Sequence, residues 1–280
     1  MARARVARFE HELGSGTRAQ RAASPGVREL LGRELIGYHH RAVSFASWLE
    51  PPEPRLTLMI DLEGSITADG RTLPVAWIGG LETTYTIVGV GQTYGAIDLK
   101  LRPPSAYTLL GMPLGELTGA CVALEDVFGA GAREFVDRVA GAGDWDARFD
   151  LVEEFLTRRL SDGPRPTPAL EWAWDRLDAS AGRIRIEALA AELGVSRRYL
   201  ADRFRAEVGL SPKAVARQLR FADVRRRIGS EPPRWAEIAY AAGYADQSHL
   251  NREFRELAGT TPSEFVARRI PHGGLVGDGI

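Results

Sequence analysis

Residues 238–255 read Ile238-Ala239-Tyr240-Ala241-Ala242-Gly243-Tyr244-Ala245-Asp246-Gln247-Ser248-His249-Leu250-Asn251-Arg252-Glu253-Phe254-Arg255. A short helical pattern ends at Gly243, where a positive φ costs little. Asp246 follows, and its carboxylate can accept hydrogen bonds from the free N–H groups of a second helix. Leu250 and Phe254, four residues apart, turn one face of that helix inward. The stretch therefore predicts a helix-turn-helix unit whose second helix has a polar outer face.

The same pattern occurs once earlier, in residues 189–205, so the C-terminal half contains an internal repeat. The offset is 49 residues before the turn and 50 after it. The matched pairs are Leu189 with Ile238, Gly194 with Gly243, Phe204 with Phe254, and Pro212 with Pro262. In the first copy Ser196 takes the capping position. Two helix-turn-helix units are therefore expected.

The segment between the two units reads as one long helix. Pro212 is well placed at a helix start, and apolar residues recur on one side as far as Ile228. A helix from Pro212 to Ile228 would be about 25 Å long at roughly 1.5 Å per residue. Such a rod could hold two recognition helices near the roughly 34 Å repeat of successive major grooves.

A second domain precedes the helical one. Strand-like runs separated by glycine-bearing turns occur at 56–62, 75–78, 83–90 and 96–101, and a helical pattern occupies 133–160. We therefore expect a multidomain α+β protein: a β-rich, barrel-like domain with a helical tail, then an all-α domain with two helix-turn-helix subdomains joined by a long helix. The expected boundaries are 1–160 for the sensor or dimerisation domain, 161–168 for the proline-rich linker, 169–270 for the DNA-binding domain and 271–280 for a disordered tail.

Charge is unevenly distributed along the 280 residues, although the net charge is only -1. Residues 181–270 hold 17 Lys and Arg against 11 Asp and Glu, whereas the remainder holds 19 against 26. A basic C-terminal region is what a nucleic-acid-binding module requires. The sequence contains no run of eighteen apolar residues, so no membrane span is predicted. Met1 to Glu10 lacks the apolar core of a secretory signal, and a cytoplasmic protein is therefore expected.

The segment from Ile186 to Phe265 closely resembles the AraC/XylS family of transcription regulators. The resemblance is carried by the second unit, through Ile238-Ala239, Gly243-Tyr244, Asp246 to Leu250, Arg252, Phe254-Arg255, Gly259, Thr261-Pro262 and Phe265. It implies sequence-specific binding of double-stranded DNA, with RNA polymerase, a small-molecule effector and a second copy of the chain as candidate partners. The stretch Leu109 to Leu117 is similar to a cupin-like, β-barrel sensor subgroup of the family. Activation and repression are both left open.

The resemblance also assigns positions that contact DNA. The implied base-reading residues are Arg197, Arg198, Ala201 and Asp202 in the first unit, and Gln247, Ser248, Asn251 and Arg252 in the second. Arginine can bind guanine with two hydrogen bonds, and Asn or Gln can bind adenine, but Ala201 offers only a methyl group and Asp202 repels phosphate. The expected phosphate contacts are Arg205, Lys213, Arg217 and Arg255.

Each of these interpretations has a structural alternative. Arg225-Arg226-Arg227 reads equally as a phosphate patch or as a solvated helix face. Tyr199 and His249 hold the same place in the two copies and are interpreted as packing residues rather than base readers. Trp235 is assigned to the core of the second unit.

The rest of the chain carries no recognisable catalytic or metal-binding motif. Cys121, the single cysteine, is expected to be a small buried hydrophobe, and the adjacent His39 and His40 would point to opposite faces of a strand. No cofactor, metal ion or enzymatic activity is therefore predicted. Three functions remain. The first is a regulator that responds to a small apolar or aromatic effector, which would act through residues 133–160. The second is a ligand-independent accessory regulator with a dimerising first domain, and the third, ranked last, is an enzyme with a DNA-targeting domain, such as one that transfers an alkyl group to Cys121.

Overall fold

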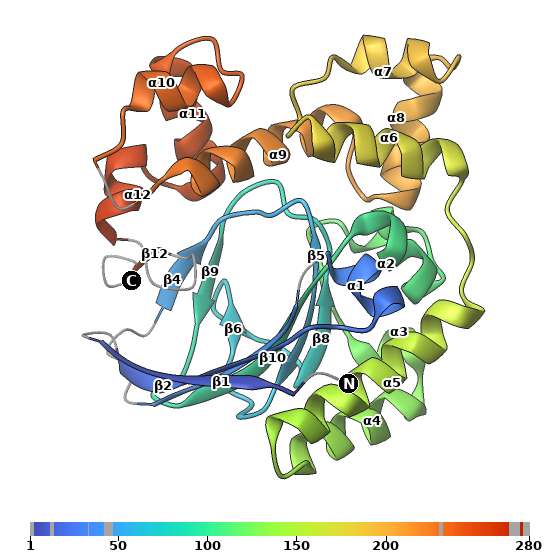
Figure 1. The fold of residues 1–280 in the computed structure, drawn as a ribbon, viewed down its shortest axis with the longest axis vertical. Helices are drawn as coiled ribbons and strands as arrows, with labels where there is room; N and C mark the ends of the chain where they lie inside the picture. The colour runs from blue at the N-terminus through green and yellow to red at the C-terminus, as the bar shows by residue number, and fades with distance from the viewer. Residues whose placement is uncertain are drawn as a thin grey trace.

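The structure is a computed structural model, and it describes residues 3–11, 14–32, 34–41, 47–229, 232–268 and 275–276. Two parts can be distinguished. A β-rich part with flanking helices comprises the first 162 residues, and a helical part from Pro168 onwards lies across one end of it (Figure 1). The predicted fold class is confirmed.

Two antiparallel sheets form the β-rich part. The larger sheet has the order β1-β2-β3-β10-β5-β8-β11, and the smaller has the order β12-β4-β9-β6-β7. The bounds in the larger sheet are β1 (Arg5–His11), β2 (Gly14–Arg21), β3 (Leu35–Arg41), β10 (Tyr94–Leu101), β5 (Leu56–Asp61), β8 (Ala76–Gly79) and β11 (Cys121–Ala123). Those in the smaller sheet are β12 (Leu275–Val276), β4 (Ser47–Glu50), β9 (Thr86–Gly89), β6 (Thr67–Ala68) and β7 (Arg71–Thr72). The four predicted strands correspond to β5, β8, β9 and β10.

Successive side chains of β10 point to opposite faces of the larger sheet, and the two faces differ in character. Ile97, Leu99 and Leu101 are buried in the main apolar core, which helices α1 (Pro25–Leu31) and α2 (Pro103–Leu110) help to cover. Asp98 and Lys100, at the intervening positions, line the space between the two sheets. The space between the sheets is therefore lined by both charged and apolar side chains, and it forms a cavity.

Three helices pack against the sheet at the far end from the helix-turn-helix units. They are α3 (Leu124–Phe128), α4 (Ala130–Gly141) and α5 (Trp145–Asp162), which confirm the predicted helical tail. The rings of Phe135 and Phe155 stack at 4.1 Å between α4 and α5. Buried Arg21 of β2 pairs with Glu153 at 3.1 Å and Asp150 at 2.7 Å, which fastens α5 to the sheet.

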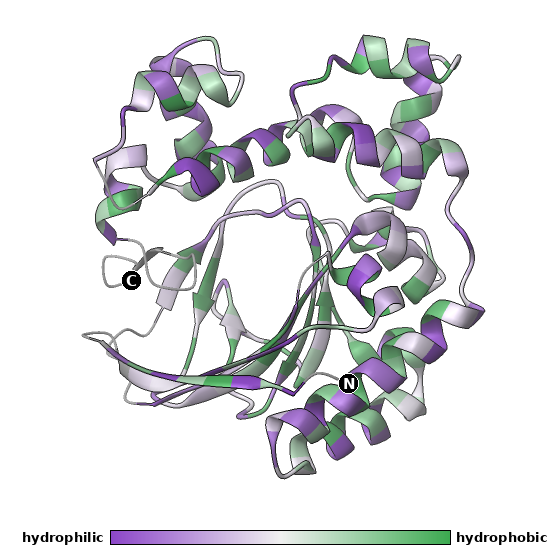
Figure 2. Ribbon diagram, viewed as in Figure 1, coloured by the Kyte–Doolittle hydropathy of each residue, from purple (hydrophilic) through white to green (hydrophobic). Residues whose placement is uncertain are grey.

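The helical part consists of α6 (Pro168–Ala179), α7 (Ile186–Glu192), α8 (Arg197–Glu207), α9 (Pro212–Arg227), α10 (Trp235–Ala241), α11 (Gln247–Ala258) and α12 (Pro262–Arg268). Because α5 continues to Asp162, the segment that connects the two parts is 163–167, shorter than the expected linker. Hydrophobic and hydrophilic residues alternate along these helices (Figure 2). No helix among the described residues has the length and apolar character needed to cross a bilayer.

The expected disordered tail needs one correction. Leu275–Val276 form β12, which pairs with β4 of the smaller sheet, so the prediction is wrong for these two residues. Backbone hydrogen bonds to an available strand edge explain the order. The remaining residues of 271–280 lie outside the described part of the chain.

The two helix-turn-helix units relate differently to the β-rich part. The first unit shares its core, since Leu200 and Phe204 belong to the same apolar cluster as the larger sheet. Helix η1 (Leu114–Leu117) lies so close to α8 that a Cβ at Gly115 would come within 2.6 Å of the Arg205 carbonyl oxygen. The second unit has a separate core built on Phe221, Phe254 and Phe265.

Candidate nucleic-acid interface and ligand cavity

The second unit has the predicted anatomy. Gly243 ends the first helix with φ 83°, and the Asp246 side chain accepts a 2.7 Å hydrogen bond from the His249 amide at the start of α11. Leu250 and Phe254 are fully buried beneath that helix. Capping and burial thus fix the outer face of α11 toward solvent.

The first unit repeats this arrangement. Gly194 has φ 67°, and the Ser196 hydroxyl accepts a 3.1 Å hydrogen bond from the Tyr199 amide at the start of α8. Leu200 and Phe204 again hold the helix to its core. The repeat read from the sequence is therefore a structural repeat.

Helix α9 joins the two units as expected. Ser211 caps it by accepting from the Ala214 amide at 3.3 Å, and Pro212 occupies its first turn. Its 16 residues correspond to about 24 Å at roughly 1.5 Å per residue. Val215 and Val224 are fully buried, one toward each end of the helix. A single continuous helix therefore sets the separation of α8 and α11.

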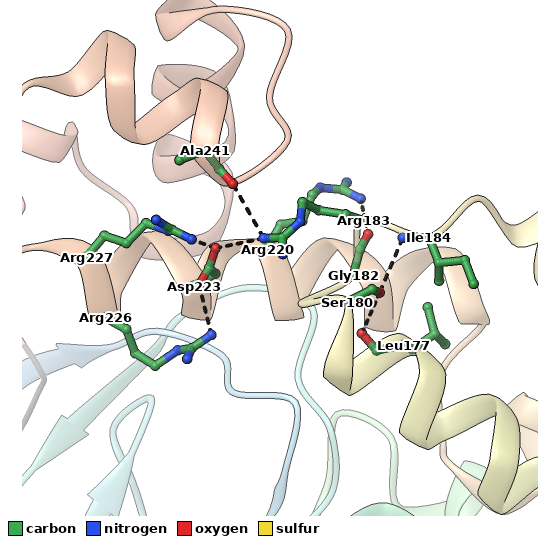
Figure 3. A network of polar contacts seen from close by, with 10 residues as sticks. All are labelled: Leu177, Ser180, Gly182, Arg183, Ile184, Arg220, Asp223, Arg226, Arg227 and Ala241. Atoms are coloured by element: carbon green, nitrogen blue, oxygen red, sulfur yellow. Dashed lines mark hydrogen bonds and ion pairs between the residues drawn. The ribbon is translucent and has the colours of Figure 1, made fainter.

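A buried carboxylate near the C-terminal end of α9 pairs with three guanidinium groups (Figure 3). Asp223 pairs with Arg226 at 2.9 Å, with Arg227 at 2.9 Å and with Arg183 at 3.3 Å. The same Nη1 atom of Arg183 donates to the Ala241 carbonyl oxygen at 3.4 Å. This group, hereafter the Asp223 clasp, connects the turn after α6, the long helix and the end of α10.

The clasp bears on the two interpretations of Arg225-Arg226-Arg227. Arg226 and Arg227 pair with Asp223, and Arg225 pairs with Glu53 of the β-rich part at 3.7 Å. All three arginines thus have carboxylate partners within the chain, a role that neither interpretation included.

None of the eight implied base-reading residues is buried. Arg197, Arg198, Asp202, Gln247, Ser248 and Arg252 are exposed, whereas Ala201 and Asn251 are half-buried. Asp202 lies between two arginines, 3.9 Å from Arg198 and 3.0 Å from Arg205. Its carboxylate thus has a structural use: it can orient neighbouring guanidinium groups.

The implied phosphate contacts fall into two groups. Arg205, Lys213 and Arg255 are exposed. Arg217 is half-buried; its Nε donates to both carboxylate oxygens of Glu253, at 2.8 and 2.9 Å, and its Nη2 pairs with Glu256. The phosphate role of Arg217 stays a prediction that competes with this internal pair.

Tyr199 and His249, which the sequence analysis interpreted in the same way, lie in different surroundings. Tyr199 is 52% exposed at the start of α8, so its assignment as a packing residue is wrong; it lies in the first turn, beyond the inward stripe of Leu200 and Phe204. His249 packs against Tyr244, with ring centroids 5.2 Å apart. Trp235 packs on Phe254, with ring centroids 6.2 Å apart, which confirms its place in the core of the second unit.

A cavity of about 880 Å³ lies between the two sheets. Sequence reasoning offered no means of naming its lining. Its lining includes Tyr38, Trp48, Glu50, Trp77, Glu82, Tyr94, Asp98 and Lys100, which come from four strands and the loop after β8. They were missed because an inward position becomes apparent only when the strands are paired.

Charged groups inside this cavity influence one another. Lys100 Nζ donates to the Thr57 hydroxyl at 3.0 Å and pairs with Asp98 at 3.3 Å. Burial alone lowers the pKa of Lys100, but Asp98, Glu53 and Glu50 more than compensate and raise it. Burial raises the pKa of Glu50, although Lys100 and Arg225 oppose the shift. The neighbouring carboxylates therefore favour the charged form of Lys100, whereas burial disfavours the charged form of Glu50.

Cys121 is exposed, so the expectation of a buried hydrophobe is wrong. It lies on β11, the edge strand of the larger sheet, and lines the cavity. Partial desolvation, then the charges of Glu82 and Asp69, raise the pKa of its thiol to about 11. The surrounding protein thus disfavours a thiolate although solvent can reach the residue.

The adjacent histidines lie in different surroundings. His40 is buried and stacks on Tyr94 with ring centroids 4.5 Å apart. His39 Nε2 lies 3.0 Å from a Glu63 carboxylate oxygen. Within the described residues, no group of three or more His, Cys, Asp or Glu could hold a metal ion.

Comparison with known proteins agrees with the geometry of the helical part. Residues 189–268 match a family described as a helix-turn-helix domain. The chain is 28% identical over 168 residues to a "Probable bifunctional transcriptional activator/DNA repair enzyme AlkA" from Mycobacterium tuberculosis, a match that covers 60% of this chain and 29% of that protein. It is 29% identical over 139 residues to the "HTH-type transcriptional regulator GlxA" of Rhizobium meliloti, covering 48% of this chain and 42% of that one. A "Putative AraC-like transcription regulator" of Streptomyces antibioticus is 30% identical over 86 residues, 31% of this chain and 28% of that protein.

Residues 189–268 of the helical part are thus a helix-turn-helix domain. One of these relatives is described as AraC-like, which agrees with the family that the sequence resembles. The chain spans less than half the length of each of these curated relatives. Among solved structures, ToxT from Vibrio cholerae aligns with 83% of this chain and 97% of its own, at 12% identity and a TM-score of 0.46.

Proposed function

We propose that this chain is a sequence-specific DNA-binding transcription regulator in which one chain reads two successive major grooves. The observation that carries the proposal is the placement of α8 and α11, two capped helices with polar outer faces, near the two ends of one continuous helix, α9. A recognition helix in the major groove presents its exposed N-terminal side chains to base edges.

The proposed base contacts are the outward-facing residues of these two helices. In the second unit Gln247, Asn251 and Arg252 offer donors and acceptors suited to adenine and guanine. In the first unit Arg197 and Arg198 are the proposed readers, and each has an acidic neighbour, Glu187 and Asp202 respectively. Binding to DNA would exchange these exposed, weak ion pairs for contacts to bases.

Phosphate contacts are proposed for Arg205, Lys213 and Arg255, which are exposed and basic. Arg217 is proposed as a contact of the same kind only if it exchanges Glu253 and Glu256 for phosphate. Such contacts position the protein on the duplex without reading its sequence, and they make binding depend on salt concentration.

We further propose that the cavity binds a small-molecule effector. A ligand-independent accessory domain would be expected to fill its interior with apolar side chains. Here the inward face carries Asp98, Lys100 and Glu50 around about 880 Å³ of space, which is a typical volume for a small-molecule site. Exposure of charged side chains to an internal space favours a ligand that can pair with them.

The effector is proposed to act through the loop between β8 and β9. Glu82 of this loop lines the cavity, and its carbonyl oxygen accepts from the buried amide of Gln218 on α9. Two residues further on, the Thr84 hydroxyl donates to the Glu256 carbonyl oxygen of α11 at 2.9 Å. These contacts favour this loop, rather than the helices of 133–160, as the route between ligand and DNA.

Selection of bound sequences from random duplex DNA tests the proposal. The full chain is expected to enrich a defined sequence, and purified protein should bind that duplex far more tightly than a scrambled one, by about 10³-fold or more at physiological salt. Equal affinity for selected and scrambled duplexes would overturn the proposed function.

A further inference from the structure

We infer that the cavity takes a small organic cation with a flat apolar body, whose charged group lies in the corner formed by Tyr38, Trp48, Tyr94, Glu50 and Asp98. This inference rests on the proposed effector function and names the chemistry of the effector. The five residues are hereafter the aromatic–acid corner; all of them line the cavity.

Three aromatic rings from three strands meet in this corner. The rings of Tyr38 and Tyr94 lie edge to face with centroids 5.8 Å apart, and the Trp48 ring lies 6.1 Å from that of Tyr94. The π faces of such rings attract a cation placed within about 6 Å, most strongly when both partners are desolvated. An alkylammonium group would therefore find several aromatic rings in one place.

Negative charge exceeds positive charge in the same corner. Glu50 accepts a 2.9 Å hydrogen bond from the Trp48 indole, which is a neutral donor. The ammonium group of Lys100 has Asp98 and Thr57 as its close contacts. Glu53 pairs with Arg225. One carboxylate, that of Glu50, is thus left without a cation in contact among the described residues.

The pKa shifts of the two tyrosine hydroxyls indicate the same excess of negative charge. After burial, the charges that raise the pKa of Tyr94 are those of Glu50 and Asp98. The same two carboxylates are among the charges that raise the pKa of Tyr38, again after burial. Arg18, the cross-strand neighbour of Tyr38, also lines the cavity, and it is not among the charges that shift the pKa of Tyr94. The corner therefore presents a negative potential to an incoming group.

Another part of the lining offers a hydrogen-bond donor. Trp77 on β8 is 8% exposed, and its indole Nε1 has no hydrogen-bond partner among the described residues. A buried donor without a partner is costly, and it favours a ligand that carries an acceptor. Trp77 and Met59 also provide apolar surface for a flat ring. The favoured ligand thus has a cationic end, an apolar body and an acceptor.

Three probes of similar size and different charge test this inference: benzyltrimethylammonium, benzyl alcohol and benzoate. Binding to the full chain is measured by isothermal titration calorimetry and by quenching of tryptophan fluorescence. The cation is expected to bind about tenfold more tightly than the alcohol, with benzoate weaker still. Equal affinity for the cation and the alcohol, a preference for benzoate, or no binding of any probe would overturn the inference.

Matched variants locate the charge. Glu50→Gln is expected to weaken binding of the cation about tenfold and to leave benzyl alcohol unchanged, whereas Glu125→Gln, which removes an exposed carboxylate of α3 outside the cavity, should change neither by more than about twofold. Asp98→Asn provides a second variant should Glu50→Gln fail to fold, and it should weaken the cation in the same way. Equal effects of Glu50→Gln and Glu125→Gln would contradict the assignment of the corner.

Operator binding by the same preparations separates the two proposals. If the selected duplex is still bound tightly while none of the probes shows charge preference, the ligand inference fails and the DNA-binding function stands. If no duplex is selected, the proposed function fails whatever the probes do.

Discussion

Arg183 Nη1 lies 3.3 Å from the buried carboxylate of Asp223 and also 3.4 Å from the Ala241 carbonyl oxygen. Arg183 follows α6 in the first unit, Asp223 lies in α9, and Ala241 ends α10 of the second unit. One guanidinium group therefore touches all three elements that determine how the two helix-turn-helix units are placed. The Asp223 side chain is only 7% exposed, so solvent weakens this pair less than it weakens a surface ion pair.

Asp223→Asn is expected to loosen the connection between the two units. It removes the charge that three arginines share, and these arginines are themselves partly exposed, so the loss of stability should be about 1–2 kcal/mol rather than the full cost of a broken buried pair. Affinity for a duplex with both half-sites should fall more than affinity for one half-site. Chemical denaturation and fluorescence anisotropy measure the two effects.

A matched control is Glu237→Gln, which removes the exposed pair with Arg234 on α10. It should change stability by less than about 0.5 kcal/mol. If Asp223→Asn behaves like this control in both assays, the clasp does not position the units.

Arg252→Ala is expected to weaken binding to the selected operator by about 1–3 kcal/mol and to relax specificity at one base position. The reason is that Arg252 is exposed on the outer face of α11, where a guanidinium can reach a guanine. Anisotropy titrations on the operator and on single-base variants give the result. Equal losses on operator and random duplexes would mean that Arg252 contacts phosphate or nothing.

Lys213→Ala should weaken binding to all duplexes alike and lower the slope of log K against log salt by about 1. Arg217→Ala tests the competing roles of Arg217. Loss of its pairs with Glu253 and Glu256 should lower thermal stability, and the salt slope should change less than in Lys213→Ala. A fall in slope equal to that of Lys213→Ala, with stability unchanged, would favour the phosphate role.

Glu264 stabilises the start of α12 in a pH-dependent manner. Its carboxylate accepts from the Thr261 amide at 2.9 Å, and the Glu264 amide donates back to the Thr261 hydroxyl at 3.3 Å. The hydrogen bond from the Thr261 amide, then those from the Thr260 and Thr261 hydroxyls, lower the pKa of Glu264 from 4.5 to about 2. Because the folded-state pKa is the lower one, this contribution is present above the unfolded-state pKa and is lost as the pH falls towards 2.

The variant Glu264→Gln should therefore be less stable than the wild type at pH 7, and the difference should shrink between pH of about 5 and 2. Urea denaturation at a series of pH values measures it. A difference that stays constant across this range would show that the ionised carboxylate is not the stabilising group.

Local signals in the sequence were sufficient for the DNA-binding half. Gly243 and Asp246 lie within four residues of each other, so the turn and its cap can be read directly, and Ser196 repeats the cap. The Asp223 clasp could not be read in this way, because Arg183 and Asp223 are 40 residues apart. The arginine run at 225–227 looked like a surface feature because its carboxylate partners come from packing.

The β-rich half was harder to predict from the sequence, because its features also depend on contacts between distant residues. Strands β1 to β3 carry Arg and His residues that obscure the apolar alternation, and none of the three was predicted. Cys121 was misjudged because an apolar neighbourhood in sequence does not reveal an edge strand. The cavity lining depends on strand register: Ile36 faces Asp98, and Asp98 faces Met59. Register between distant strands is a property of the folded sheet.

The spacing of half-sites in selected operators tests most directly whether α8 and α11 enter one duplex together. The structure predicts two enriched boxes whose centres lie about 10 base pairs apart, one helical turn. Inserting five base pairs between them should turn one box to the opposite face of the duplex and lower the affinity at least about 100-fold, and a second insertion of five should restore part of it. Unchanged affinity after the first insertion, or enrichment of a single box, would contradict simultaneous reading by the two helices.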